Sequence, residues 1–119
     1  MSNEHVIDET LQSLRDFLPR VADACLIISN FLRSDNETDA LKIIHQFTEA
    51  TEWSIQAINS IKLLNYPLNI DTSRINEHLK EAKDGLEIYD LVILADMFEY
   101  EIHPEIETWI NEIKVLSGD

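Results

Sequence analysis

Apolar residues recur every three or four positions along most of the chain, which is the spacing of amphipathic α-helices. The first such stripe runs from Ile7 to Leu32. It is wider than the seam of a two-stranded coiled coil, which favours the core of a helical bundle. Pro19 interrupts the stripe without shifting its phase, so we predict one kinked helix rather than two separate helices. The residues that widen the stripe are Phe17, Ala24, Ile27 and Phe31.

A second helix is predicted to begin near Ser34, because Ser34 and Glu37 have the spacing of a capping box. Tyr66 precedes Pro67, and a residue before proline is disfavoured in helices. We therefore predict that residues 65–71 form a connecting loop. The inward face of this helix is predicted to contain Leu41, Ile44, Phe47, Thr51, Ile55 and Ile58.

A third long helix is predicted to start with a cap within residues 71–73 and to end at residues 103–104. Its apolar spacing continues across Gly85, so this glycine is expected to mark a close helix crossing or a local bend. Proline is favoured in the first turn of a helix, so Pro104 predicts the start of a short fourth helix. The apolar positions of the third helix are Ile75, Leu79, Ala82, Leu86, Tyr89 and Ile93, and those of the fourth are Ile106, Trp109, Ile110, Ile113 and Leu116.

Together these elements predict an all-α fold, an antiparallel helical bundle of three long helices plus a short C-terminal helix. Two glycines and three prolines are too few for the many tight turns of an all-β domain. A length of 119 residues suits one domain, so residues 1–119 are predicted to form a single helical-bundle domain. Because a helix of about 28 residues is about 42 Å long, we expect a rod-shaped molecule.

The charge of the chain narrows the classes of function. There are 23 acidic and 9 basic residues, which give a formal net charge of −14. Nucleic-acid binding requires clustered Lys and Arg, so we expect no such partner. The sequence has no apolar stretch long enough for a membrane span and no signal-peptide pattern at its start, so we expect a cytoplasmic protein without a membrane partner. The single cysteine, Cys25, lies on the first apolar stripe and is expected to be a buried thiol.

Negative charge accumulates between Lys83 and Lys114, a segment without Lys or Arg. Glu99 and Glu101 stand near the predicted end of the third helix, where the helix dipole disfavours acids. We therefore predict that a partner supplies the missing positive charge, with Trp109 as an apolar anchor if it is exposed. The candidate partner-binding residues are Asp96, Glu99, Tyr100, Glu101, Glu105, Glu107 and Trp109.

The segment from Leu94 to Glu101, followed by Pro104, Glu107 and Trp109, resembles a small uncharacterised bacterial family of short acidic helical proteins. The resemblance implies a helical fold and a cytoplasmic location, and it implies no catalytic activity. The positions that match the family pattern are Asp96, Glu99, Tyr100, Glu101, Pro104, Glu107 and Trp109.

Three classes of function follow as hypotheses. The first is a non-enzymatic interaction module without a cofactor, in which the third and fourth helices bind a basic or amphipathic segment of a protein partner. A related alternative is a chaperone of the secretion or flagellar type that covers a helix of its client. The second class is a metal-binding or hydrolytic bundle, and the third is a mimic of nucleic-acid charge. The second class would use His45 and Glu49, four residues apart on one helix, with Asp23 and Asp96. Asp96 continues the apolar stripe of the third helix and is expected to be a buried carboxylate.

The width of the first stripe also predicts a homodimer. Phe17, Ala24 and Phe31 exceed what one seam requires, so they are expected to lie in a two-fold contact centred on the first helix. Such a contact would leave the acidic C-terminal halves pointing away from each other.

Overall fold

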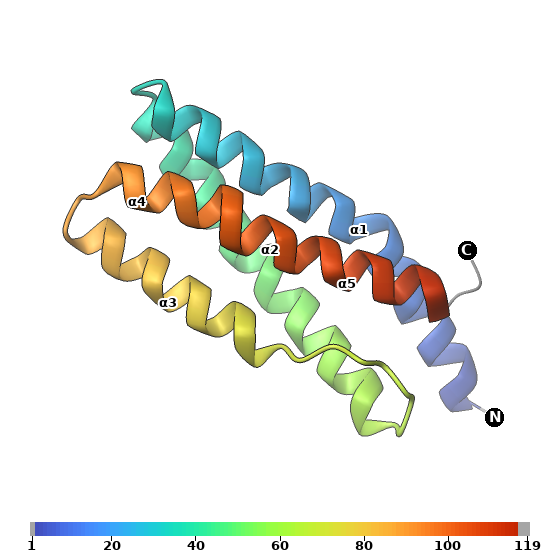
Figure 1. Ribbon diagram of the computed structural model, residues 1–119. Helices are drawn as coiled ribbons and strands as arrows, with labels where there is room; N and C mark the ends of the chain where they lie inside the picture. Colours follow the sequence, from blue (N-terminus) through green and yellow to red (C-terminus); the bar gives the residue numbers. More distant parts are fainter. Residues whose placement is uncertain (1, 117–119) are drawn as a thin grey trace.

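Six helical segments follow one another in the computed structural model, which describes residues 2–116, and no strand occurs in that range. The last three segments are contiguous, so the chain forms four antiparallel rods, up, down, up and down (Figure 1). The prediction of an all-α fold is confirmed. The segments are α1 (Ser2–Arg33), α2 (Glu37–Leu63), α3 (Ser73–Glu87), α4 (Leu91–Asp96), the π-helix η1 (Met97–Ile102) and α5 (His103–Leu116).

Helix α1 is the central element of the molecule, because it packs against α2, α4, η1 and α5. Its buried residues follow the predicted stripe and also include Ala22 and Ser29, and Cys25 is fully buried, as predicted. Burial raises the pKa of the Cys25 thiol to about 12, which keeps it protonated at neutral pH. The principal extents of 51 × 21 × 19 Å give the rod shape that the helix lengths predict. Among residues 2–116, no helix combines the length and apolarity that crossing a bilayer requires.

Pro19 lies inside α1, which continues through it as one helix, as predicted. The proline is exposed, so it makes no contribution to the core. Phe17, two residues earlier, is half-buried, and its ring packs edge-on against Trp53 of α2 with 5.2 Å between ring centroids.

The predicted capping box at the start of α2 is wrong. Ser34 instead donates its hydroxyl hydrogen to the carbonyl of Asn30 at 2.7 Å, and α2 begins at Glu37. Asp35 has a φ of 61°, and the Asn36 N–H donates to the Phe31 carbonyl at 2.9 Å. The turn is thus an α1 C-terminus closed by a left-handed residue, a conformation that aspartate tolerates better than most residues.

The connection after α2 is non-helical from residue 64 to residue 72, which confirms the predicted loop. It is fixed to the bundle, because Leu68 and Ile70 are buried and Lys62 Nζ donates to the Ile70 carbonyl at 2.7 Å. On α2, the inward position predicted for Leu41 is wrong, since this side chain is 43% exposed.

The predicted third helix ends sixteen positions earlier than expected, at Glu87 rather than at residue 103. Tyr89 has a φ of 58° and donates its N–H to the Leu86 carbonyl at 3.1 Å. The Asp90 N–H donates to the Gly85 carbonyl at 2.9 Å, which completes a Schellman motif. The Asp90 carboxylate then accepts the Ile93 N–H at 3.0 Å and so caps α4. The short helix of the bundle is therefore the third, α3, and not the C-terminal one.

The predicted boundary at residues 103–104 is also wrong, because the chain stays helical from Leu91 to Leu116. Pro104 cannot donate a hydrogen bond, and its ring crowds the carbonyl four residues earlier in a regular α-helix. The wider turns of η1 end just before this proline, and the His103 N–H donates to the Phe98 carbonyl five residues back. A π-helical segment thus accommodates the proline inside a continuous rod.

Candidate functional site

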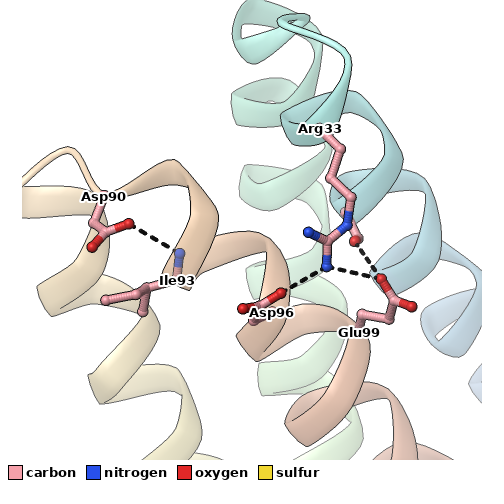
Figure 2. A network of polar contacts seen from close by, with 6 residues as sticks. Arg33, Asp90, Ile93, Asp96 and Glu99 are labelled. Carbon is pink, nitrogen blue, oxygen red and sulfur yellow. Dashed lines mark hydrogen bonds and ion pairs between the residues drawn. The ribbon is translucent and has the colours of Figure 1, made fainter.

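Arg33, in the last turn of α1, lies between two of the predicted site residues (Figure 2). One guanidinium nitrogen, Nη2, is 2.8 Å from Asp96 Oδ1 and 3.0 Å from Glu99 Oε1. The Ser29 hydroxyl, one turn earlier on α1, donates to the same Glu99 oxygen at 3.1 Å. The hydrogen bond from Arg33 is the main cause that lowers the pKa of Glu99, and the carboxylates in turn raise the pKa of Arg33.

This network and its position in the fold correct three expectations. The positive charge for Glu99 comes from within the chain, through a residue 66 positions away in the sequence, and not from a partner. The site also lies in the middle of a continuous rod, so no helix end disfavours the acid. Asp96 is not a buried carboxylate, since its side chain is 50% exposed and paired.

The other predicted site residues fall on different surfaces. Tyr100, Glu101 and Glu105 face α3, where they line a small polar pocket of about 220 Å³ with Arg74 and other neighbours. Glu105 is largely buried and lies 3.7 Å from Arg74 Nε. Glu107 is paired with His103 on its own helix at 3.4 Å. The residues therefore do not form one acidic surface, and partner binding at the exposed Tyr100 and Glu101 stays a prediction.

Trp109 cannot be an exposed anchor, because only 1% of the residue is accessible. It belongs to the hydrophobic core that α1, α2, the loop after α2, α3, α4, η1 and α5 share. The other prediction for Trp109, that it lies on the apolar face of the last helix, is confirmed by its burial.

The pKa of Glu99 gives a testable pH dependence. An acid whose pKa is lowered in the folded state contributes stability above its ordinary pKa of 4.5 and loses it as pH falls through the lowered value. Glu99→Gln is therefore expected to destabilise the protein at pH 7, and the deficit should shrink as pH falls below about 4.5. Urea unfolding of both proteins at several pH values between 3 and 7 measures this difference.

Glu101→Gln is the matched control for this prediction. Glu101 is exposed on the same helix and forms no ion pair with any residue from 2 to 116, yet its substitution changes the net charge equally. It is expected to be neutral or slightly stabilising, because it reduces the self-repulsion of an acidic chain. Identical pH profiles for the two variants would contradict the role of Arg33.

The alternative carboxylate and histidine cluster does not assemble. His45 and Glu49 form an exposed pair on α2 at 2.9 Å, whereas Asp96 is held by Arg33. Within the described part of the chain, no group of three or more His, Cys, Asp or Glu side chains is placed to hold a metal ion.

A groove between α2 and α3 is a concave feature that the sequence did not reveal. It has a volume of about 430 Å³, and the buried residues Leu94 and Phe98 of the last rod are part of its lining. The Phe98 ring also packs edge-on against Phe47 of α2, with 5.3 Å between ring centroids. The other apolar lining residues are Ile44 on α2 and Leu79, Ala82 and Leu86 on α3.

These lining residues were predicted to be core positions, and three of them are only half-buried. Ile44, Leu79 and Leu86 line an open groove because α2 and α3 are not closely packed against each other along it. Polar residues stand at the edges: Thr48 and Glu52 on α2, and Asn76, Lys80 and Lys83 on α3. The groove thus combines an apolar floor with charged rims, the usual composition of a site that binds an amphipathic ligand.

The predicted homodimer surface is partly used within the chain. Phe17 and Ala24 line a shallow depression of about 260 Å³ together with residues of α2, and Phe31 is half-buried. Ile27, beside them, remains 44% exposed. The homodimer therefore stays a prediction, with a smaller unpaired apolar area than the sequence indicated.

The fold and site define an all-α protein of four antiparallel rods with an apolar groove between the second and the third. Residues 9–112 match the DUF8042 family, which is described as a domain of unknown function. Because this match covers most of the chain, the protein belongs to that family, and the resemblance to an uncharacterised family is confirmed. No curated protein and no solved structure matches the sequence.

Proposed function

We propose that this protein is a non-enzymatic interaction module that binds an amphipathic helix of a protein partner in the groove between α2 and α3. The observation that carries the proposal is the apolar floor of the groove, an opening of about 430 Å³ that is lined by the half-buried Ile44, Leu79 and Leu86 together with the buried Leu94 and Phe98. The proposed binding site therefore lies on α2, α3 and the start of the last rod rather than at the exposed Tyr100 and Glu101.

The spacing of the lining residues suits a helical ligand. Ile44, Thr48 and Glu52 succeed one another at intervals of four on α2, so they form one straight edge. On α3 the lining extends from Asn76 to Leu86, which at 1.5 Å per residue corresponds to about 15 Å. That length accepts about three turns of a helix, whose apolar face would cover Leu79 and Leu86.

The negative charge of the chain is expected to affect how fast a partner binds. A net charge of −14 accelerates the encounter with a partner that is basic overall, while the groove supplies the apolar contact that holds it. If the captured helix is one that the partner buries in its own assembly, the module acts as a client chaperone, the alternative that the sequence also allows.

Site-specific photo-crosslinking in the native cells tests the proposal. A photoreactive phenylalanine analogue at Thr48 is expected to attach a partner segment with an amphipathic helical pattern, because Thr48 is exposed at the groove. Thr108 on α5 is the matched control, since both threonines donate their hydroxyl hydrogen to the carbonyl four residues earlier, at 2.9 and 3.0 Å. The adduct is identified by mass spectrometry of the crosslinked peptides.

The comparison of the two positions decides the outcome. Adducts at Thr48 that are at least about tenfold more abundant than those at Thr108 support the groove. Equal adducts, or adducts whose partner segments lack helical apolar spacing, would count against it.

A further inference from the structure

The two lysines on the α3 rim indicate the chemistry of the occupant. We propose that the helix bound in the groove carries acidic side chains along the flank that lies over α3, where they pair with Lys80 and Lys83. This inference rests on the proposed function and adds the charge pattern of the partner.

Charge is segregated around α3. Lys80 and Lys83 both line the groove, whereas the acids of the same helix do not. The two lysines are three residues apart, so they lie one turn apart on one face. The acids excluded from the groove are Glu77, Glu81, Asp84 and Glu87.

Neither lysine forms an ion pair with any residue between 2 and 116, although the chain has a large surplus of acids. By contrast, Arg33 and Arg74 use acids of the last rod. The α2 edge carries Glu52 instead of a base, so the two rims of the groove carry opposite charges. A helix with acids over α3, and with neutral or basic residues over α2, complements both rims.

The position of the lysines favours a helix over a small amphiphile. Lys80 and Lys83 lie in the middle of the stretch from Asn76 to Leu86, not at its end. A fatty acid has a single carboxylate at the end of its apolar chain, so it would pair with a cation at one end of an apolar groove. Acids one turn apart along a helical flank, in contrast, reach two lysines one turn apart while the apolar face stays on the floor.

Three synthetic helical peptides test the inference. They share one apolar face, with Leu at helical spacing, and differ only in one flank, which carries two Glu, two Gln or two Lys residues one turn apart. Calorimetric titration at about 0.15 M salt, where the Debye length is about 8 Å, limits non-specific attraction. The Glu peptide is expected to bind the unsubstituted protein more tightly than the Gln peptide does.

Charge reversal in the protein supplies the decisive comparison. In the double variant Lys80→Glu with Lys83→Glu, affinity for the Glu peptide is expected to fall about tenfold, and affinity for the Lys peptide is expected to rise. The matched control is Arg20→Glu with Lys42→Glu, which changes the net charge equally at two exposed residues outside the groove. It is expected to change affinity for the Glu peptide by no more than about twofold. Circular dichroism confirms that each variant is folded.

The variant Thr48→Trp fills the groove and is expected to abolish binding of all three peptides, whereas Thr108→Trp leaves it intact. If the peptides bind in the groove without a charge preference, or if both double variants weaken the Glu peptide equally, the inference is overturned and the proposed function stands. If no peptide binds, or if Thr48→Trp has no effect, the proposed function fails as well. Binding of dodecanoate that is lost in Lys80→Glu with Lys83→Glu, without any peptide binding, would overturn both in favour of a lipid-like ligand.

Discussion

Replacing Trp109 with alanine is expected to reduce the free energy of unfolding by about 3–5 kcal/mol. The side chain is one of the largest fully buried groups, so its removal leaves a cavity where α5 packs on α1. A small domain has about 5–15 kcal/mol of stability in total, so the variant should be close to its unfolding limit. Urea denaturation monitored by circular dichroism measures the change.

Trp53→Ala is the control for this prediction, because Trp53 is 44% exposed and forms an edge-on ring contact with Phe17. Its loss is expected to cost about 1 kcal/mol. Equal losses for the two variants would contradict the burial of Trp109. In the variant Trp53→Phe, the remaining indole should resist acrylamide quenching, which reports burial independently of stability.

Replacing Pro19 with alanine is expected to raise the free energy of unfolding by about 2 kcal/mol. An interior proline costs about 3 kcal/mol relative to alanine, because it lacks the N–H that would donate to the Arg15 carbonyl. Alanine gives back about 0.4–1 kcal/mol of this gain by making the unfolded chain more flexible. Pro19 is exposed, so the substitution removes no core contact. The midpoint and slope of urea unfolding test the change.

Pro67→Ala should act in the opposite direction. Pro67 is exposed in the non-helical connection between α2 and α3, so alanine there only increases the freedom of the unfolded chain. We expect a loss of about 0.4–1 kcal/mol. If Pro19→Ala also destabilises, the local backbone geometry at the proline is required for the packing of α1 against α2 and α5.

The groove and the ion pairs of Arg33 call for different experiments. Substitutions at Glu99 act first on stability, because this carboxylate joins the last rod to α1 through Arg33. Substitutions at Lys80 or Lys83 break no ion pair with any residue from 2 to 116, so a change in partner affinity there reports the groove itself. Interaction studies of this family therefore gain most from variants on the α3 rim.

The helical fold and most of the core could be predicted from periodicity alone. The first stripe from Ile7 to Leu32 is buried as expected, because a repeat of three and four residues places side chains on one face of a helix whatever its neighbours. The loop after α2 was also foreseeable from Tyr66–Pro67, since the restriction before proline is local.

The two mistaken boundaries show where local rules fail. The turns after α1 and α2 contain Asp35 and Asn65, residue types that tolerate a positive φ, whereas the turn after α3 contains Tyr89, a residue type that ordinarily avoids it. The apolar spacing also continues through this turn, so nothing in the sequence pattern separates α3 from α4. Pro104 misleads in the opposite direction. It predicts the start of a new helix, but the π-helix before it accommodates the proline and the rod continues without a break.

Only the tertiary structure could assign the candidate sites. Arg33 reaches Asp96 and Glu99 across more than sixty residues, and such a pairing leaves no trace in local spacing. The same holds for the groove, because amphipathic spacing says that Ile44 and Leu79 face inward but not whether another helix covers them. The sequence by itself therefore determined which faces are apolar, through the periodicity of the helix. The packing of the rods decided which of those faces remain open, because that depends on the distance between α2 and α3.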